Sequence, residues 1–225
     1  MWPFPTKQLS AYLSKQSLLA WETPQDKGQS KLQKLPSIRL EKLAHSINAQ
    51  GNLPPDFKQF KTTLRLAPSL GRCYTLQASN TKLGSSELKV IAEHWGKTFM
   101  GSNYSAWQWQ AAQAQAGDPI LLCACQVHAE YLNVFQTVKP ELLNLIDSLK
   151  ADDSAWVVCR DEFLVQSALV TDGVIRSIRT WPSYYTSHVK EVIEKHILLA
   201  NDTLGKNIHH VVESSLGEVQ THGAT

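Results

Sequence analysis

The sequence predicts a mixed α/β fold. A segment with strand alternation, 72–78, comes just before one clear amphipathic helix over 85–99. Further along, Asp172–Gly173 is a strong tight-turn signal between two strands over 163–170 and 174–181, which makes an antiparallel hairpin. Helices mixed with antiparallel hairpins exclude a purely doubly wound sheet and a TIM barrel.

Elements before residue 70 follow from periodicity and turn residues. A strand is expected over 12–22, and a Thr-Pro-Gln-Asp-Lys-Gly turn separates it from a second strand over 31–38. Residues 40–49 carry an apolar stripe at helical spacing, and Gly51 is placed to end that helix. Residues 62–66 alternate as a strand.

The helix over 85–99 has start signals as well as a stripe. Ser85 or Ser86 is expected to cap its N-terminus, and the negative charge of Glu87 suits the positive N-terminal end of the helix dipole. Its apolar stripe consists of Leu88, Ile91, Ala92, Trp95 and Phe99. The elements expected after it are strands 107–111 and 120–125, helices 128–135 and 140–149, strand 156–159, the hairpin named above, a helix beginning after Ser187, and a closing strand 208–212.

Composition indicates a globular chain. Of the 225 residues, 43% are hydrophobic and 19% are charged, which excludes a disordered chain. No apolar run approaches the roughly 20 residues needed to cross a bilayer, and residues 1–7 lack the pattern of a signal peptide. We therefore expect a soluble, cytoplasmic protein.

Charge is unevenly distributed along the chain. Residues 1–65 contain ten Lys/Arg and four Asp/Glu, a net +6, so with 22 and 20 in total the remainder carries 12 against 16, a net −4. These basic residues form either a solvated face or a docking surface, which would bind an acidic partner or an anionic membrane surface. If they converged on one surface, a nucleic-acid binder would be the alternative, although the overall charge of +2 argues against nucleic acid as a partner.

Neither cysteines nor histidines are spaced for a metal site. Cys123 and Cys125 lie on one face of the expected strand 120–125, and the favoured interpretation is buried structural thiols over a Cys-x-Cys metal ligand pair. The eight histidines show no metal-binding spacing. No catalytic residue, metal or cofactor is predicted, although a cysteine nucleophile paired with a distant histidine stays open.

Several local phrases resemble the actin-like cytoplasmic proteins of type IV pilus and type II secretion machines, PilM-like and GspL-like. The resemblance covers roughly residues 12–212 and rests on the order of elements. In the first part of the chain it is carried by Arg72–Leu76, Ser86–Leu88, Leu121–Ala124 and Val138–Glu141. In the second part it is carried by Trp156–Val158, Leu169–Gly173 and Ile175–Arg179.

The resemblance implies a ribonuclease-H/actin-like, two-lobed architecture. The first lobe would span 1–152 and include an inserted strand–helix–strand subdomain at about 70–126. The second lobe, 153–225, would be abbreviated and end in a frayed tail. Asp152 and Asp153 mark the loop that separates them.

The chain departs from the nucleotide-binding members of this fold. Those proteins hold phosphate and magnesium with glycine-rich, acidic hairpins at the openings of both lobes, because only glycine permits the close backbone approach. Here the corresponding segments are 14–19, without an Asp-x-Gly, and 159–164, where Asp161 is followed by neither glycine nor Ser/Thr in the required place. The prediction is a non-catalytic scaffold or adaptor, and the alternative is a functional actin-like ATPase.

Aromatic and basic residues supply the candidate interaction surface. Trp107 and Trp109 form either a stacking platform or core packing against Trp95, and the stretch from Trp181 to Tyr185 is either a lobe-to-lobe contact or an interaction surface. The candidate residues are Trp107, Trp109, Trp181, Tyr184, Tyr185, Lys31, Lys34 and Arg39. By the resemblance, the partners are proteins of a pilus- or secretion-type assembly, including the cytoplasmic tail of a membrane protein that would hold the chain at the inner membrane.

Overall fold

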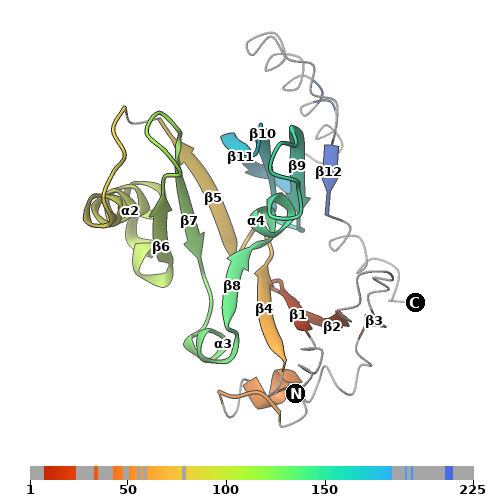
Figure 1. Cartoon of the computed structure of the whole chain (residues 1–225). Coiled ribbons are helices and arrows are strands. Elements are labelled where there is room, and N and C mark those ends of the chain that lie inside the picture. The colour runs from red at the N-terminus through yellow and green to blue at the C-terminus, as the bar shows by residue number, and fades with distance from the viewer. Residues whose placement is uncertain are drawn as a thin grey trace, which may run out of the picture.

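The structure is a computed structural model with three sheets (Figure 1). It describes residues 8–23, 33–34, 43–47, 51–54, 57, 60–77, 80–183, 191, 194 and 211–214. Within those residues, no helix has the length and apolar character required to span a membrane.

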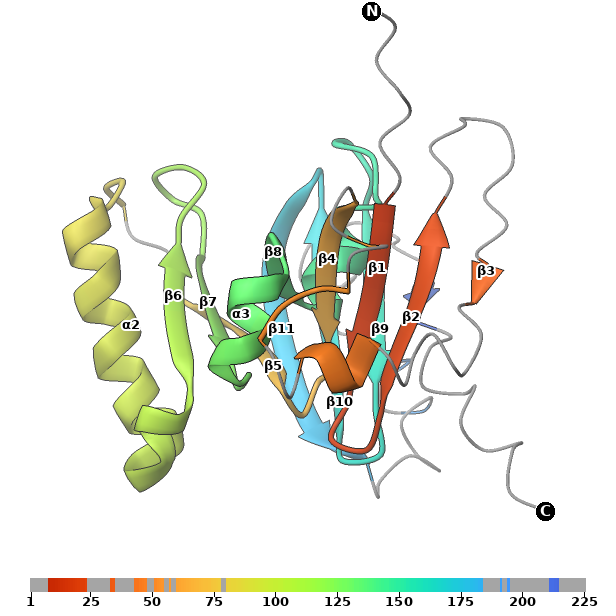
Figure 2. The same cartoon turned by 90° about the horizontal axis from the view of Figure 1, so that it is seen from below.

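The first sheet has five strands in the order β3-β2-β1-β4-β8, which Figure 2 shows side by side. In chain order these are β1 (Gln8–Leu13), β2 (Leu18–Thr23), β3 (Gln33–Lys34), β4 (Lys61–Leu66) and β8 (Thr137–Pro140). β2 runs antiparallel to both of its neighbours, whereas β4 is parallel to β1 and β8 is parallel to β4.

The second sheet repeats that order with four strands, β11-β10-β9-β12. Its members are β9 (Ala155–Arg160), β10 (Leu164–Thr171), β11 (Val174–Pro182) and β12 (Val211–Glu213). Here too an antiparallel meander is followed by a strand that returns parallel to the first, β12 beside β9. The two sheets therefore repeat one topology. The mixed α/β fold class is confirmed, while the domain boundary near 152 stays a prediction.

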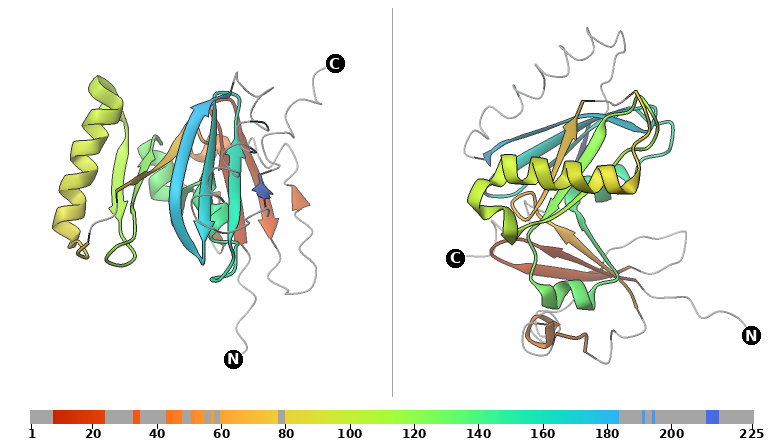
Figure 3. Two further views of the ribbon diagram at one scale, coloured as in Figure 1. Left: turned by 90° about the horizontal axis from the view of Figure 1, so that it is seen from above. Right: turned by 90° about the vertical axis from the view of Figure 1, so that its left-hand side faces the viewer.

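The third sheet stands apart from the first and carries its own helix. It consists of β5 (Gly71–Leu76), β7 (Ile120–Cys125) and β6 (Gln108–Ala112), all antiparallel. Helix α2 (Ser85–Met100) crosses one face of this sheet, as the right-hand view of Figure 3 shows, and a 3-10 helix η2 (Gly101–Ala106) connects it to β6.

Two short helices connect the sheets. α3 (Ala129–Val134) follows β7 and packs on the core of the first sheet through Tyr131 and Val134. α4 (Glu141–Ile146) follows β8, and its Leu142 joins the core beneath the second sheet. That second core also contains Cys73 from β5, so it binds the third sheet to the second.

Most predicted elements are confirmed, with four corrections. The strand expected over 12–22 is wrong, because residues 14–17 turn the chain and divide it into β1 and β2. The N-cap of α2 is Gly84, not Ser85 or Ser86, and its N–H donates to the Glu87 carboxylate at 2.7 Å. Trp107 lies just outside β6. Helix 140–149 is shorter, since Pro140 ends β8, a strand that the pattern had not indicated.

Some expectations lie at the margins of the described residues. Of the helix expected over 40–49, residues 43–47 are helical and the remainder lies outside the described residues. The helix expected after Ser187 also lies outside them, apart from the helical residues Glu191 and Glu194. The closing strand is present as β12.

Candidate functional site: the junction of two hairpins

The candidate site is the junction between two hairpins, β1–β2 of the first sheet and β9–β10 of the second. The first turn of each sheet lies there. In the first sheet, the Ser14 N–H donates to the Ser17 carbonyl at 2.9 Å and closes the β1–β2 turn. In the second sheet, the Asp161 N–H donates to the Leu164 carbonyl at 2.9 Å and closes the β9–β10 turn. These are the two turns at which the resemblance would place phosphate-binding loops.

The two turns contact each other directly. The amide of Gln16 donates a hydrogen bond to the carboxylate of Glu162. Beside it, the Lys15 ammonium lies 4.7 Å from the centroid of the Phe163 ring, a cation–π distance. The tips of the two hairpins therefore bind one another across the junction.

Each turn also satisfies its own backbone N–H groups with a side chain. The Ser14 hydroxyl accepts from the N–H of Ser17 at 3.0 Å and from the N–H of Gln16 at 3.3 Å. The Asp161 carboxylate accepts from the N–H groups of Phe163 and Leu164, each at 2.8 Å. Backbone N–H groups of this kind bind phosphate when they are free, and here they are occupied.

Asp161 extends this network to the third sheet. Its second carboxylate oxygen accepts a hydrogen bond from the backbone N–H of Ser69 at 2.7 Å. Ser69 is buried in the turn between β4 and β5. The Asp161 carboxylate thus accepts hydrogen bonds from three backbone N–H groups in two segments of the chain, and it is itself the anion that these groups bind.

Another carboxylate near the junction, that of Glu141, is also engaged. It is 1% exposed, forms a salt bridge with Arg65 on β4, and accepts from the Ser214 hydroxyl at 3.1 Å. The Arg65 guanidinium in turn lies 5.2 Å from the centroid of the Trp21 ring. This buried ion pair joins the first sheet, α4 and Ser214, the residue that follows β12.

The electrostatics of this region disfavour further negative charge. Burial raises the pKa of the Tyr12 hydroxyl far above its ordinary value, and the charges of Glu141 and Asp161 raise it further. The pKa of the Cys159 thiol is raised by the same causes in the same order. A phosphate placed here would be repelled by the negative charges of Glu141 and Asp161, both of which already accept hydrogen bonds from the protein.

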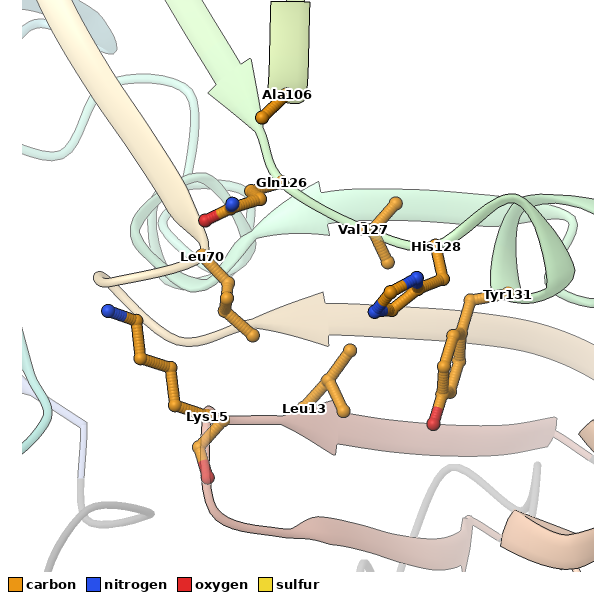
Figure 4. Close-up of a pocket in the computed structure, with 9 residues that line it drawn as sticks. Leu13, Lys15, Leu70, Ala106, Gln126, Val127, His128 and Tyr131 are labelled. Atoms are coloured by element: carbon orange, nitrogen blue, oxygen red, sulfur yellow. The ribbon is translucent and has the colours of Figure 1, made fainter. Parts of the chain in front are cut away.

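A pocket of about 620 Å³ lies next to the first hairpin, between it and the base of the third sheet (Figure 4). Its apolar lining includes Leu13, Leu70 and the ring of Tyr131. Lys15 and His128 bring basic groups to the same space. No acidic side chain is among the described residues that line it.

The structure places three of the candidate surface residues. Trp107 is buried, with the Arg72 guanidinium 4.9 Å from its ring centroid. Trp109 is half-buried between Tyr74 and Tyr104, with ring centroids 6.3 Å away on each side. Trp181 is half-buried and belongs to a different sheet, on β11 opposite Val165.

Of the remaining candidates, one lies on a described strand. Lys34 belongs to β3, while Lys31, Arg39, Tyr184 and Tyr185 lie outside the described residues. The interaction surface as a whole stays a prediction. One basic residue of the N-terminal third, Arg65, is not on an open face, because it pairs with buried Glu141.

The cysteines lie in the packed interior as free thiols. Cys73 and Cys159 are buried, and Cys123, half-buried, has its sulfur 3.9 Å from that of Cys73 on the neighbouring strand. Within the described part of the chain, no cluster of three or more His, Cys, Asp or Glu side chains has the arrangement of a metal site.

Sequence reasoning singled out Asp161 but missed its partner Ser69 and the pair Arg65–Glu141. The available signal for Arg65 was its position between Leu64 and Leu66 in an alternating strand whose leucines are fully buried. For Ser69 the sequence contained no comparable signal, since a backbone N–H carries no residue type.

No protein-family model matches this chain, and no curated protein matches it either. Among solved structures, it is similar to a Bacteroides thetaiotaomicron protein of unknown function with an actin-like ATPase fold, at 11% identity and a TM-score of 0.46, over 96% of this chain and 95% of that one. It is also similar to the cytoplasmic domain of EpsL, an inner membrane component of the type II secretion system of Vibrio cholerae, at 9% identity and a TM-score of 0.47, over 98% and 90%.

A third similar structure is the PilM–PilN type IV pilus biogenesis complex, at 11% identity and a TM-score of 0.43, over 89% of this chain and 69% of that one. The structural neighbours therefore include the pilus and secretion proteins named from the sequence resemblance. These likenesses concern the path of the chain.

Proposed function

We propose that this protein is a non-catalytic scaffold or adaptor that keeps the actin-like arrangement of sheets without a nucleotide site. The observation that carries the proposal is the direct contact between the two hairpins, Gln16 with Glu162 and Lys15 with Phe163. In a nucleotide-binding protein of this architecture, phosphates would occupy that space.

Three further features support the loss of nucleotide binding. Neither turn, 14–17 nor 161–164, contains a glycine that would let a phosphate approach the backbone. The N–H groups of both turns already donate to Ser14 or Asp161. Asp161 and Glu141, two of the carboxylates at the junction, are engaged by protein donors and so are poor ligands for the magnesium that accompanies ATP.

We place the binding of a protein partner at the pocket beside the first hairpin. Its apolar walls suit an aliphatic or aromatic side chain, while Lys15 and His128 suit an acidic group on the same segment. By the resemblance, this partner belongs to a pilus- or secretion-type assembly in the cytoplasm, and the tail of a membrane protein would bring the chain to the inner membrane.

Calorimetric titration with Mg-ATP, and with ADP as a control, tests the first part of the proposal. We expect no binding heat at millimolar nucleotide. Magnesium-dependent binding would overturn the scaffold proposal in favour of an actin-like ATPase, because the hairpins would then have to separate to admit phosphate.

Affinity capture from the native cells tests the second part. We expect the chain to retain an envelope-assembly protein and Lys15→Glu to lose it, because the new carboxylate repels the acidic group of the partner. Lys82→Glu, with the same charge change at an exposed position away from the pocket, is the matched control. Equal capture by both variants would exclude the pocket as the docking place, and capture of no envelope component would count against the assembly role.

A further inference from the structure

Among the described residues, the three sheets have six edge strands, and five of these strands contain a charged residue or a proline. Such residues are a common means by which soluble proteins keep the open edge of a sheet from pairing with another strand. The strands that contain such residues are β3 with Lys34, β8 with Lys139 and Pro140, β11 with Arg176, Arg179 and Pro182, β12 with Glu213, and β5 with Arg72.

The sixth edge, β6, lacks this protection. Its sequence is Gln-Trp-Gln-Ala-Ala, and no Lys, Arg, Asp or Glu occurs anywhere from residue 98 to residue 117. With 19% of the whole chain charged, a stretch of this length without charge around an edge strand is unusual for a surface that faces only water.

The packing around β6 leaves its outer edge open. Trp109 lies on the face of the sheet that α2 covers, where it packs against Tyr104 and Gly96. Gln108, Gln110 and Ala112 alternate with it and are exposed. Within the described part of the chain, no strand pairs with β6 on the side away from β7.

The opposite edge of the same sheet, strand β5, is covered by another part of the chain. There, β5 is approached by β11 of the second sheet, and the Ile178 N–H donates to the Thr75 hydroxyl at 3.0 Å. The third sheet is therefore covered at one edge by the chain's own second sheet and open at the other. Its open edge is the uncharged one.

We propose that β6 pairs antiparallel with β6 of a second copy of this chain. A twofold axis near Gln110 would then join two three-stranded sheets into one of six strands, β5-β7-β6 continued by the partner's β6, β7 and β5. The second copy is the occupant that the charges favour. A self-paired strand meets its own sequence, so an uncharged edge is free of like-charge contacts, whereas a charged partner strand would find no opposite charge on β6.

Light scattering after size exclusion, at concentrations up to the millimolar range, tests this dimer. We expect a mass that rises toward twice that of one chain. Gln110→Lys and Gln110→Glu each place like charges face to face at the axis and should each weaken association by roughly fivefold or more. An equimolar mixture of the two variants should restore the dimer, because a lysine then faces a glutamate.

Val90→Lys is the matched control, since it adds the same charge at a position of α2 that is 66% exposed and away from the edge. A chain that stays monomeric throughout, charge variants that dimerise like the wild type, or a mixture that fails to recover the dimer would each overturn the proposal. Amide hydrogen exchange of the unmodified chain gives an independent measurement. Exchange over 108–112 should slow as concentration rises, and an unchanged rate would also overturn it.

Discussion

The carboxylate of Asp161 accepts a hydrogen bond from the backbone N–H of Ser69 at 2.7 Å, although the two residues lie 92 positions apart. Ser69 belongs to the turn that leads from the first sheet into the third, and Asp161 opens the first turn of the second sheet. One side chain therefore joins all three sheets. Asp161 therefore acts as a structural connector.

Replacement of Asp161 should lower stability in proportion to this role. Asp161→Asn keeps the shape but removes the charge, and its amide N–H₂ would face one of three N–H donors that need an acceptor. We expect the free energy of unfolding to fall by about 2 kcal/mol, measured by urea denaturation. Asp152→Asn, at an exposed position of the preceding loop, is the control. Equal stability of the two variants would contradict the connector role.

The pair Arg65–Glu141 should show the behaviour of a buried ion pair. Glu141→Gln leaves the Arg65 guanidinium, 14% exposed, without its counter-charge, and we expect a loss of about 3 kcal/mol or more. The double change Arg65→Met with Glu141→Leu should cost less than the sum of the single changes. The exposed pair Lys139–Asp147 provides a comparison, since Asp147→Asn should cost less than about 1 kcal/mol. Strict additivity at 65 and 141 would show that the two side chains act independently.

Local features of this fold were predictable from the sequence. The Asp172–Gly173 turn has φ angles of +52° and +71°, the left-handed values that this pair of residues tolerates. Gly173 is further required by space, because a Cβ there would lie 2.0 Å from the carbonyl oxygen of Ala151. The turn angles depend on two adjacent residues, and the close contact with Ala151 leaves room for glycine alone. Both requirements are therefore visible in the residue types at 172 and 173.

The turn at 14–17 was not predictable in the same way. It contains no Gly, Pro, Asn or Asp, and depends on the hydroxyl of Ser14, a weaker turn signal. The junction was harder still, because its contacts join residues far apart in the chain, such as Gln16 with Glu162. The resemblance places both hairpins at the openings of the lobes, but no residue type near Gln16 or Glu162 indicates that these two side chains meet.

Because α2 packs closely on the third sheet, a Gly→Ala change in this helix should lower stability, where such a change usually raises it. In an exposed helix, Gly→Ala stabilises by up to about 1 kcal/mol. At Gly96 the added Cβ would lie 2.8 Å from the Trp109 ring and 2.6 Å from the Tyr104 ring. We expect Gly96→Ala to lower stability by about 1 to 3 kcal/mol instead, measured by thermal or chemical unfolding. Ser86→Ala, exposed in the first turn of α2, should be neutral or stabilising, and a stabilised Gly96→Ala would show that the rings do not press on the helix.

The cysteine thiols that pack in the interior should make the stability of the fold fall at alkaline pH. Burial raises the pKa of Cys125 from its ordinary 9.0 to about 12, and the pKa values of Cys73 and Cys159 are raised well above 9.0 for the same reason. Below pH 9 these thiols are protonated in both the folded and the unfolded chain, so their contribution is fully present. Above pH 9 the unfolded chain loses the protons first, and the free energy of unfolding falls by about 1.4 kcal/mol per pH unit for each such thiol.

Cys125→Ala isolates one of these contributions from the other groups that titrate at high pH. Urea denaturation between pH 8 and pH 11 should show a shallower decline for this variant than for the wild type, whatever its stability at neutral pH, because the unfolded chain then has one thiol fewer to ionise. Parallel declines for the two proteins would mean that the Cys125 thiol ionises as readily in the folded chain as in the unfolded one. That result would contradict the packed surroundings of the cysteine, which lies against the core of the first sheet.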